Sequence, residues 1–158
     1  MIKKEIRLEY VEFSSISELP ANIQEMIHMA LEVAKKAYSP YSEFQVGAAV
    51  ELSDGQRLCA NNQENKAYPS GICAERSLLF FANGNYPETA VKIMVLVACS
   101  DGKLIDMPVY PCGACRQVMM ETEERYGEEM EIWMVGAKTT HMIQSMNVLL
   151  PLKFSFSH

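Results

Sequence analysis

The chain has 158 residues, of which 49% are hydrophobic and 22% are charged, and its formal net charge is −6. This length suits one domain with a hydrophobic core, and the composition excludes a disordered or collagen-like chain. The acidic balance disfavours a nucleic-acid partner, because a polyanion would be repelled at long range. We therefore expect a single domain over residues 1–158 that does not bind nucleic acid.

The N-terminus and the longest apolar run bear on where the protein works. Charged side chains recur within residues 3–7, too often for the apolar segment of a signal peptide. The apolar run at residues 93–99 is too short to cross a bilayer. The sequence thus predicts a cytoplasmic protein with reduced thiols and no membrane partner.

Hydrophobic periodicity predicts alternating helices and strands. Helical segments carry apolar residues three and four positions apart, strands alternate or are apolar throughout, and Gly, Asn or Pro mark boundaries. In chain order we expect first an N-terminal arm, residues 1–18, of unknown role, which includes a strand or arm at residues 5–10. A helix from Pro20 that ends before Ser39 should follow, then a hairpin of strands 44–52 and 56–60 and a helix at 73–83 closed by Asn83-Gly84. The second half should hold a central strand at 93–99, a helix at 112–126, a strand at 130–135 and a short strand or helix between Thr139 and Pro151. This order predicts an α/β fold, a three-layer α/β/α sandwich with a mixed central sheet.

Three of the five cysteines fall at predicted helix starts. Cys112 and Cys115 are spaced i, i+3, so on a helix their sulfurs project from one face towards a common point. Cys73 begins another helix, and a helix N-terminus favours the thiolate form that binds metal. Three thiolates suit zinc and leave a fourth position open, as in a catalytic zinc site. We expect Cys59 and Cys99 to be inert buried thiols.

Glu75 follows Cys73 by two positions and lies off the helical stripe that carries the thiolate. A carboxylate there is poorly placed to bind the same ion, but it can lie beside a metal-activated water and carry its proton. Cys-Ala-Glu followed by Pro-Cys-x-x-Cys is a pattern of zinc-dependent deaminases. No histidine precedes a glutamate by two positions, so Cys73 is the expected first ligand.

Four ordered motifs extend this pattern over most of the chain. They are Pro40-Tyr41-Ser42-x-Phe44-x-Val46-Gly47-Ala48-Ala49, Asn62-x-Glu64-Asn65-x-Ala67-Tyr68, Cys73-Ala74-Glu75-Arg76 and Pro111-Cys112-Gly113-Ala114-Cys115-Arg116-Gln117. With them, residues 35–154 resemble the small homotetrameric cytidine deaminases of nucleoside salvage. The resemblance implies a hydrolase with one Zn²⁺ per subunit that converts cytidine and deoxycytidine to uridine and deoxyuridine with release of ammonia.

The resemblance also implies catalytic roles. Cys73, Cys112 and Cys115 would hold the zinc ion, and zinc-bound hydroxide would attack C4 of the base. Glu75 would shuttle protons to ring N3 and to the leaving amine. Arg76 would hydrogen-bond the sulfurs and offset their charge, which would keep the metal acidic.

Substrate contacts are implied in the same way. Phe44 would stack on the pyrimidine. Asn62 and Glu64 would hydrogen-bond the ribose 3′-hydroxyl, and main-chain groups at Ala74 would hold the base. Phe154 resembles a C-terminal aromatic that reaches into a neighbouring subunit's site, so the expected homotetramer would have shared active sites.

Two departures from the family pattern leave alternatives open. Tyr110 stands where the family usually has a small serine, and the ending Pro-Leu-Lys-Phe differs from the commoner Pro-Gly-Ala-Phe. Such endings are similar to those of blasticidin-type deaminases, so one alternative is a deaminase of a modified or antibiotic cytosine nucleoside. The other is a non-catalytic zinc-stabilised module, in which Cys59 or Cys99 would complete a four-cysteine shell.

Two further features are interpreted as structural. Six glutamates lie between Glu121 and Glu131, and we expect them to form a solvated helix end and turn. His28 and His141 have no ligand pattern around them. We expect both histidines to be structural or solvated.

Overall fold

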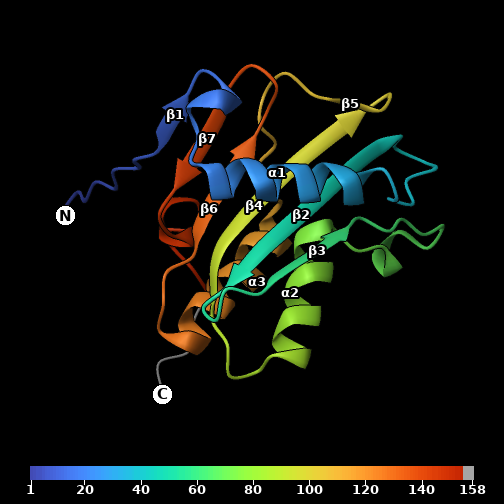
Figure 1. The fold of residues 1–158 in the computed structure, drawn as a ribbon. Coiled ribbons are helices and arrows are strands. Elements are labelled where there is room, and N and C mark those ends of the chain that lie inside the picture. Colours follow the sequence, from blue (N-terminus) through green and yellow to red (C-terminus); the bar gives the residue numbers. More distant parts are fainter. Residues whose placement is uncertain (155–158) are drawn as a thin grey trace.

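The computed structural model describes residues 1–154, which form one mixed β-sheet with helices on both faces (Figure 1). The strands are β1 (Val11–Phe13), β2 (Phe44–Leu52), β3 (Arg57–Asn61), β4 (Val91–Ser100), β5 (Lys103–Leu104), β6 (Glu131–Val135) and β7 (Thr140–Ile143). Their order is β1-β7-β6-β4-β2-β3, with β5 paired to β4. The β4–β6 pair is parallel and the others are antiparallel.

The helices complete the three layers. They are α1 (Ala21–Ala34), α2 (Ala74–Asn85) and α3 (Gly113–Tyr126), with short 3₁₀ turns at Ile16–Glu18, Tyr68–Ser70 and Met146–Val148. α1 covers one face of the sheet, and α2 and α3 cover the other (Figure 1). The predicted three-layer sandwich is therefore confirmed. No helix within residues 1–154 combines the length and the hydropathy that a bilayer span requires.

β4 is the central strand, and its two faces belong to two hydrophobic clusters. Met94 and Leu96 pack in the cluster under α2 and α3, whereas Val95 and Val97 pack in the cluster under α1. Successive side chains of a strand point to opposite faces, so a strand covered on both faces must be apolar throughout. This is why the apolar run could be predicted as the centre of the sheet.

α1 lies so close to β2 that only glycine fits at Gly47. A Cβ added there would lie 1.9 Å from the carbonyl oxygen of Ala30 and 3.0 Å from the Cβ of Ala34. Both alanines are fully buried on the predicted apolar stripe of the helix. This close approach fixes β2, which begins at Phe44 and leads into the pocket described below.

Some predicted boundaries differ from the structure. α2 runs through Gly84 to Asn85, so the predicted stop at Asn83-Gly84 is wrong. Glycine inside a helix costs about 1 kcal/mol relative to alanine, a cost that the packing of the rest of α2 outweighs. The N-terminal strand lies at Val11–Phe13, where β7 offers a free edge, and residues 1–10 form an exposed arm without regular structure. The segment after Thr139 holds both a strand and a 3₁₀ turn.

The prediction that Cys59 is buried is wrong, whereas Cys99 is buried as expected. Cys59 lies on β3, which is the last strand in the sheet order and therefore has one free edge. Residues on an edge strand are less completely covered by neighbouring strands than residues on a central strand. The strand-like, apolar surroundings of Cys59 in the sequence do not distinguish the two positions.

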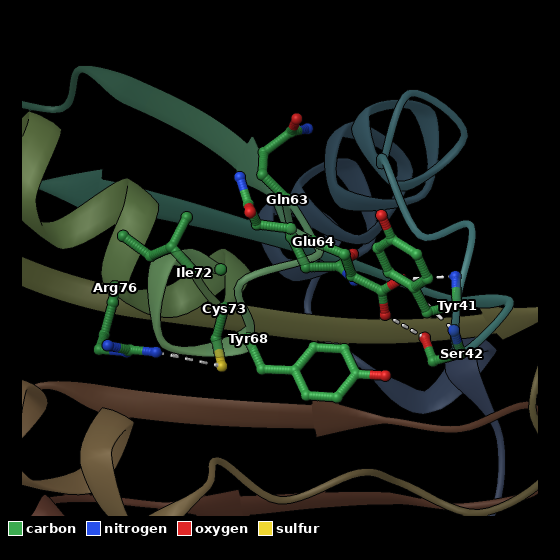
Figure 2. Close-up of a pocket in the computed structure, with 11 residues that line it drawn as sticks. Tyr41, Ser42, Gln63, Glu64, Tyr68, Ile72, Cys73 and Arg76 are labelled. Atoms are coloured by element: carbon green, nitrogen blue, oxygen red, sulfur yellow. Dashed lines mark hydrogen bonds between the residues drawn. The ribbon is translucent and has the colours of Figure 1, made fainter.

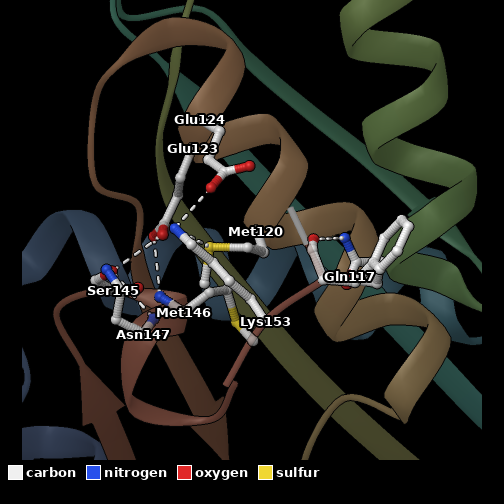
Figure 3. Close-up of polar contacts among 9 residues, drawn as sticks. Gln117, Met120, Glu123, Glu124, Ser145, Met146, Asn147 and Lys153 are labelled. Carbon is white, nitrogen blue, oxygen red and sulfur yellow. Dashed lines mark hydrogen bonds and ion pairs between the residues drawn. The ribbon is translucent and has the colours of Figure 1, made fainter. Parts of the chain in front are cut away.

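Glu123 departs from the predicted solvated cluster. Its side chain is 7% exposed, and its carboxylate accepts a hydrogen bond from the backbone N–H of Met130 (2.9 Å). It also accepts hydrogen bonds from the backbone N–H of Met146 (3.0 Å) and from Ser145 Oγ (3.0 Å) (Figure 3). These contacts join α3 to the start of β6 and to the C-terminal segment. The expectation of a wholly solvated acidic face is therefore wrong at this position.

Replacing Glu123 with glutamine tests this junction. The substitution keeps the shape but turns one acceptor oxygen into an NH₂ group that faces other donors, so we expect a loss of about 1–3 kcal/mol in the free energy of unfolding. Glu121→Gln, on the exposed side of the same helix, is the matched control and should change stability by less than about 0.5 kcal/mol. Chemical denaturation measures both variants, and equal stability of the two would contradict the assignment.

Candidate active site

Three sulfur atoms meet where α2 and α3 begin. Cys73 and Cys112 are the N-cap residues of these helices, and Cys115 lies buried in the first turn of α3. The Cys73–Cys112 sulfur distance is 3.9 Å, the Cys112–Cys115 distance is 3.4 Å, and all three sulfurs lie within 4.8 Å of one another. Tetrahedral zinc with Zn–S bonds of about 2.3 Å needs sulfurs about 3.8 Å apart. The three cysteines therefore fit one zinc ion.

No fourth protein ligand from the part of the chain that the structure describes joins this cluster. Among residues 1–154, these cysteines form the single group of three or more His, Cys, Asp or Glu side chains close enough to hold a metal ion. Neither Cys59 nor Cys99 belongs to it, so the four-cysteine shell of the non-catalytic alternative is not formed by the described residues. Three protein ligands leave one position of a tetrahedral ion open.

The surroundings of Cys73 favour its thiolate. A hydrogen bond from Cys115 and a second one from Arg76 lower the pKa of the Cys73 thiol to about 5. The pKa of Cys115 is raised, because its thiol is held in the hydrogen bond to Cys73 and because it is buried. The Nη2 group of Arg76 lies 3.7 Å from the Cys73 sulfur. The Cys73 thiolate is thus paired with the Arg76 guanidinium even without a bound metal ion.

Glu75 lies beside the cluster without being part of it. Its side chain is 6% exposed, and burial raises its pKa, with a further contribution from the negative charge of Cys73. A carboxyl group whose pKa is raised holds a proton more readily than usual, which suits proton transfer. Glu75 is not a member of the three-cysteine group, and its role as a proton carrier stays a prediction.

A pocket of about 430 Å³ opens next to the sulfur of Cys73. Its lining residues are Tyr41, Ser42, Asn62, Gln63, Glu64, Asn65, Tyr68, Gly71, Ile72, Cys73 and Arg76. Figure 2 shows Cys73 and Arg76 at one end and Tyr41, Ser42 and Glu64 at the other. The volume is within the range of small-molecule sites. A ligand that reaches the metal would therefore extend towards a polar, acceptor-rich end.

Two predicted substrate residues, Asn62 and Glu64, hold the wall of this pocket together. The amide of Asn62 accepts a hydrogen bond from Val46 N–H (2.7 Å) and donates one to the carbonyl oxygen of Phe44 (2.9 Å). The Glu64 carboxylate accepts hydrogen bonds from the backbone N–H of Tyr41 (2.9 Å) and from the hydroxyl of Ser42. Both residues therefore fix the turn that leads into β2.

The other predicted contacts, Phe44, Ala74 and Phe154, do not line this pocket. Phe44 is half-buried at the start of β2, and Ala74 is fully buried as the first residue of α2. Phe154 is 66% exposed, and its carbonyl oxygen accepts a hydrogen bond from Gln117 Nε2 (3.0 Å) on α3 (Figure 3). Lys153 next to it pairs with Glu124 at 2.7 Å. The C-terminal segment thus runs along α3 and presents Phe154 outward.

Several lining residues were not predicted. Tyr41 and Tyr68 meet edge to face with their ring centroids 6.1 Å apart. Both stand in the motifs that carried the resemblance, which is the signal that could have marked them. Ile72, which precedes Cys73, lies outside those motifs. An apolar residue in a loop gives no sequence signal for a pocket.

The geometry agrees with comparisons to known proteins. Residues 20–126 match the cytidine and deoxycytidylate deaminase zinc-binding region. The chain belongs to this family. A cytidine deaminase of Halalkalibacterium halodurans is 44% identical over 98 residues, which cover 62% of this chain and 70% of that protein. One from Sporosarcina psychrophila is 34% identical over 134 residues, covering 85% and 92%.

Solved structures of this family share the fold. The cytidine deaminase of Burkholderia pseudomallei superposes with a TM-score of 0.69 at 34% identity, covering 86% of this chain and all of that one. The enzyme of Mycobacterium tuberculosis gives a TM-score of 0.66 at 28% identity, covering 87% and 100%. The family is one of zinc-dependent hydrolytic deaminases, and the matches do not favour the alternative functions considered from the sequence.

Removing one sulfur tests the zinc ligands. We expect Cys115→Ala to lose its zinc on dialysis against a mild chelator, because two thiolates cannot hold the ion as three do. Cys99→Ala removes a buried thiol under α1 and should keep about one zinc per chain. Elemental analysis of both dialysed variants measures this. Retention of a full equivalent by Cys115→Ala would contradict the ligand set.

Proposed function

We propose that the protein catalyses the hydrolytic deamination of cytidine and deoxycytidine, giving uridine or deoxyuridine and ammonia. The observation that carries the proposal is a cluster of three cysteines beside the buried carboxyl group of Glu75, with Cys73 of that cluster at one end of a pocket of about 430 Å³. Membership of the deaminase family and the names of its relatives support the choice of a cytosine nucleoside.

Glu75 carries the protons of the reaction. Zinc, when bound to the three thiolates, supplies Lewis acidity that lowers the pKa of a water in its open position. The Glu75 carboxylate would take one proton from the attacking water and pass it to N3 of the base as the water oxygen bonds to C4. It would then pass the second proton, from the new C4 hydroxyl, to the amino group, so that the C4–N bond breaks and ammonia leaves. Its raised pKa suits both directions of transfer, because a carboxyl with an ordinary pKa would hold the proton too weakly.

Arg76 balances the charge of the cluster. Three thiolates and one divalent ion sum to −1, which weakens the acidity that the metal supplies. The guanidinium hydrogen bond to Cys73 withdraws part of that charge. The Arg76 Nε atom is buried without a hydrogen-bond partner in the described residues. The Arg76 side chain therefore keeps its position beside the Cys73 sulfur although its Nε–H group makes no hydrogen bond there.

Asn62 and Glu64 bind the ribose at the far end of the pocket. An amide has two N–H donors and two acceptor sites, so Asn62 keeps one of each after its two bonds to β2. Hydrogen bonds from Ser42 and Tyr41 lower the pKa of Glu64, so its carboxylate stays an acceptor for a hydroxyl. Phe44 stacks on the base, and main-chain groups near Cys73 and Ala74, at the start of α2, hold its polar edge.

The protein works as a homotetramer in which Phe154 reaches a neighbouring site. Phe80 and Phe81 on α2 are both about half exposed, which supports an apolar contact between subunits. The single-domain extent of residues 1–158 and the cytoplasmic location remain predictions.

A substrate panel with zinc analysis on the same sample tests the function. We expect loss of the cytidine absorbance band with both cytidine and deoxycytidine, in proportion to zinc content. Turnover of a modified or antibiotic cytosine nucleoside alone would shift the assignment to another substrate. Zinc-loaded protein that leaves all of these nucleosides unchanged would overturn the proposal.

Glu75→Gln separates proton transfer from metal binding. The variant keeps the size of the side chain but cannot carry a proton, so we expect kcat to fall at least about 10²–10⁴-fold while zinc content stays the same. Glu88→Gln, an exposed change in the turn between α2 and β4, is the control for charge. If Glu75→Gln loses its zinc, Glu75 is a ligand and the assigned role is wrong.

A further inference from the structure

β1 fixes part of the N-terminal arm to the sheet. Its antiparallel register with β7 places Glu12 directly opposite His141. The ring of Phe13 packs against Trp133 with centroids 5.3 Å apart, and the carbonyl oxygen of Phe13 accepts a hydrogen bond from Thr139 Oγ1 (3.3 Å). Glu12 is therefore held in place although residues 1–10 before it are exposed.

His141 joins Glu12 to Tyr110 through a buried imidazole. Its Nε2 lies 2.8 Å from Glu12 Oε2, and its Nδ1 is hydrogen-bonded to the Tyr110 hydroxyl. The side chain is 8% exposed, and the ring of Tyr10 lies over it with centroids 4.7 Å apart. Because a carboxylate only accepts, Nε2 donates to Glu12, while Nδ1 pairs with the Tyr110 hydroxyl. Both ring nitrogens therefore have a partner.

Tyr110 stands two residues before the zinc ligand Cys112. The peptide between them is held from the other side, because Arg116 Nε donates to the carbonyl oxygen of Pro111 (2.8 Å) and Arg116 Nη1 to that of Leu149 (3.1 Å). Cys112 itself is exposed, whereas Cys115 is fully buried. Of these two ligands, Cys112 is the one whose position depends on its backbone anchors rather than on packing.

We propose that Glu12, His141 and Tyr110 are positioning residues for Cys112, so that strand β1 tightens the zinc site. The inference rests on the proposed role of Cys112 as a zinc ligand. The length of the tyrosine side chain matters here, because a serine hydroxyl at position 110 would be too short to reach His141. The N-terminal arm, which had no role from the sequence, gains one through this chain of hydrogen bonds.

Zinc affinity is the property that this arrangement controls. Removing a group that hydrogen-bonds directly to a metal ligand typically weakens metal binding 10–100-fold. Tyr110 acts through the backbone before Cys112 and not on the sulfur itself, so we expect a smaller loss of zinc affinity, about 3–10-fold. Tyr110→Phe deletes only the hydroxyl, and Glu12→Ala only the carboxylate. Because Tyr110 and Glu12 act through the same histidine, their effects should not add. The double variant should bind zinc no more weakly than the single variant with the lower zinc affinity.

The experiment is chelator competition on the full chain, at a temperature well below unfolding. We expect Tyr110→Phe and Glu12→Ala to bind zinc about 3–10-fold more weakly than wild type. Glu12→Gln, which keeps an acceptor for His141, should recover most of the affinity. Glu9→Ala removes an exposed charge from the same arm and should bind zinc as wild type does.

The outcomes separate the inference from the proposed function. Affinities of Tyr110→Phe and Glu12→Ala within a factor of about two of wild type would overturn the positioning role, and so would an equal loss in Glu9→Ala. A wild-type protein that binds no zinc would overturn the proposed function as well. If Glu12→Ala fails to fold, Tyr110→Phe decides alone, because it removes one atom from a partly exposed ring.

Discussion

The convergence of two helix N-termini on three sulfurs is the constraint on which the site depends. Cys73 and Cys112 each end a loop and cap a helix, so each lies where the helix dipole favours a thiolate. The helices are joined further along by a hydrogen bond between Asn83 and Thr122 at 3.2 Å. A shift of one helix against the other would separate the sulfurs, so the packing of α2 on α3 is part of the metal site.

The sheet supplies the rigidity that this convergence needs. β4 is apolar on both faces, and α2 and α3 pack against one of them. On the opposite side of the sheet, the close contact of Gly47 with α1 fixes β2. The turn that Glu64 and Asn62 hold lies directly before β2 in the chain and leads into it. The polar end of the pocket and its metal end are therefore both tied to the same rigid layer.

The parts of this structure that could be predicted are those encoded by local spacing. An i, i+3 cysteine pair, a helical stripe of apolar residues and an apolar central run each indicate a local geometry. The contacts that could not be predicted join residues far apart in sequence. Glu123 looks like its exposed neighbours until the C-terminal segment packs over it, and His141 gains its role only when strand register places Glu12 opposite it.

The number of thiolates around zinc decides whether this is a deaminase site or a closed structural site, because only the deaminase site keeps an open coordination position. Zinc K-edge X-ray absorption on the zinc-loaded protein measures that number. We expect three sulfurs at about 2.3 Å and one oxygen. A shell of four sulfurs would contradict a catalytic zinc site.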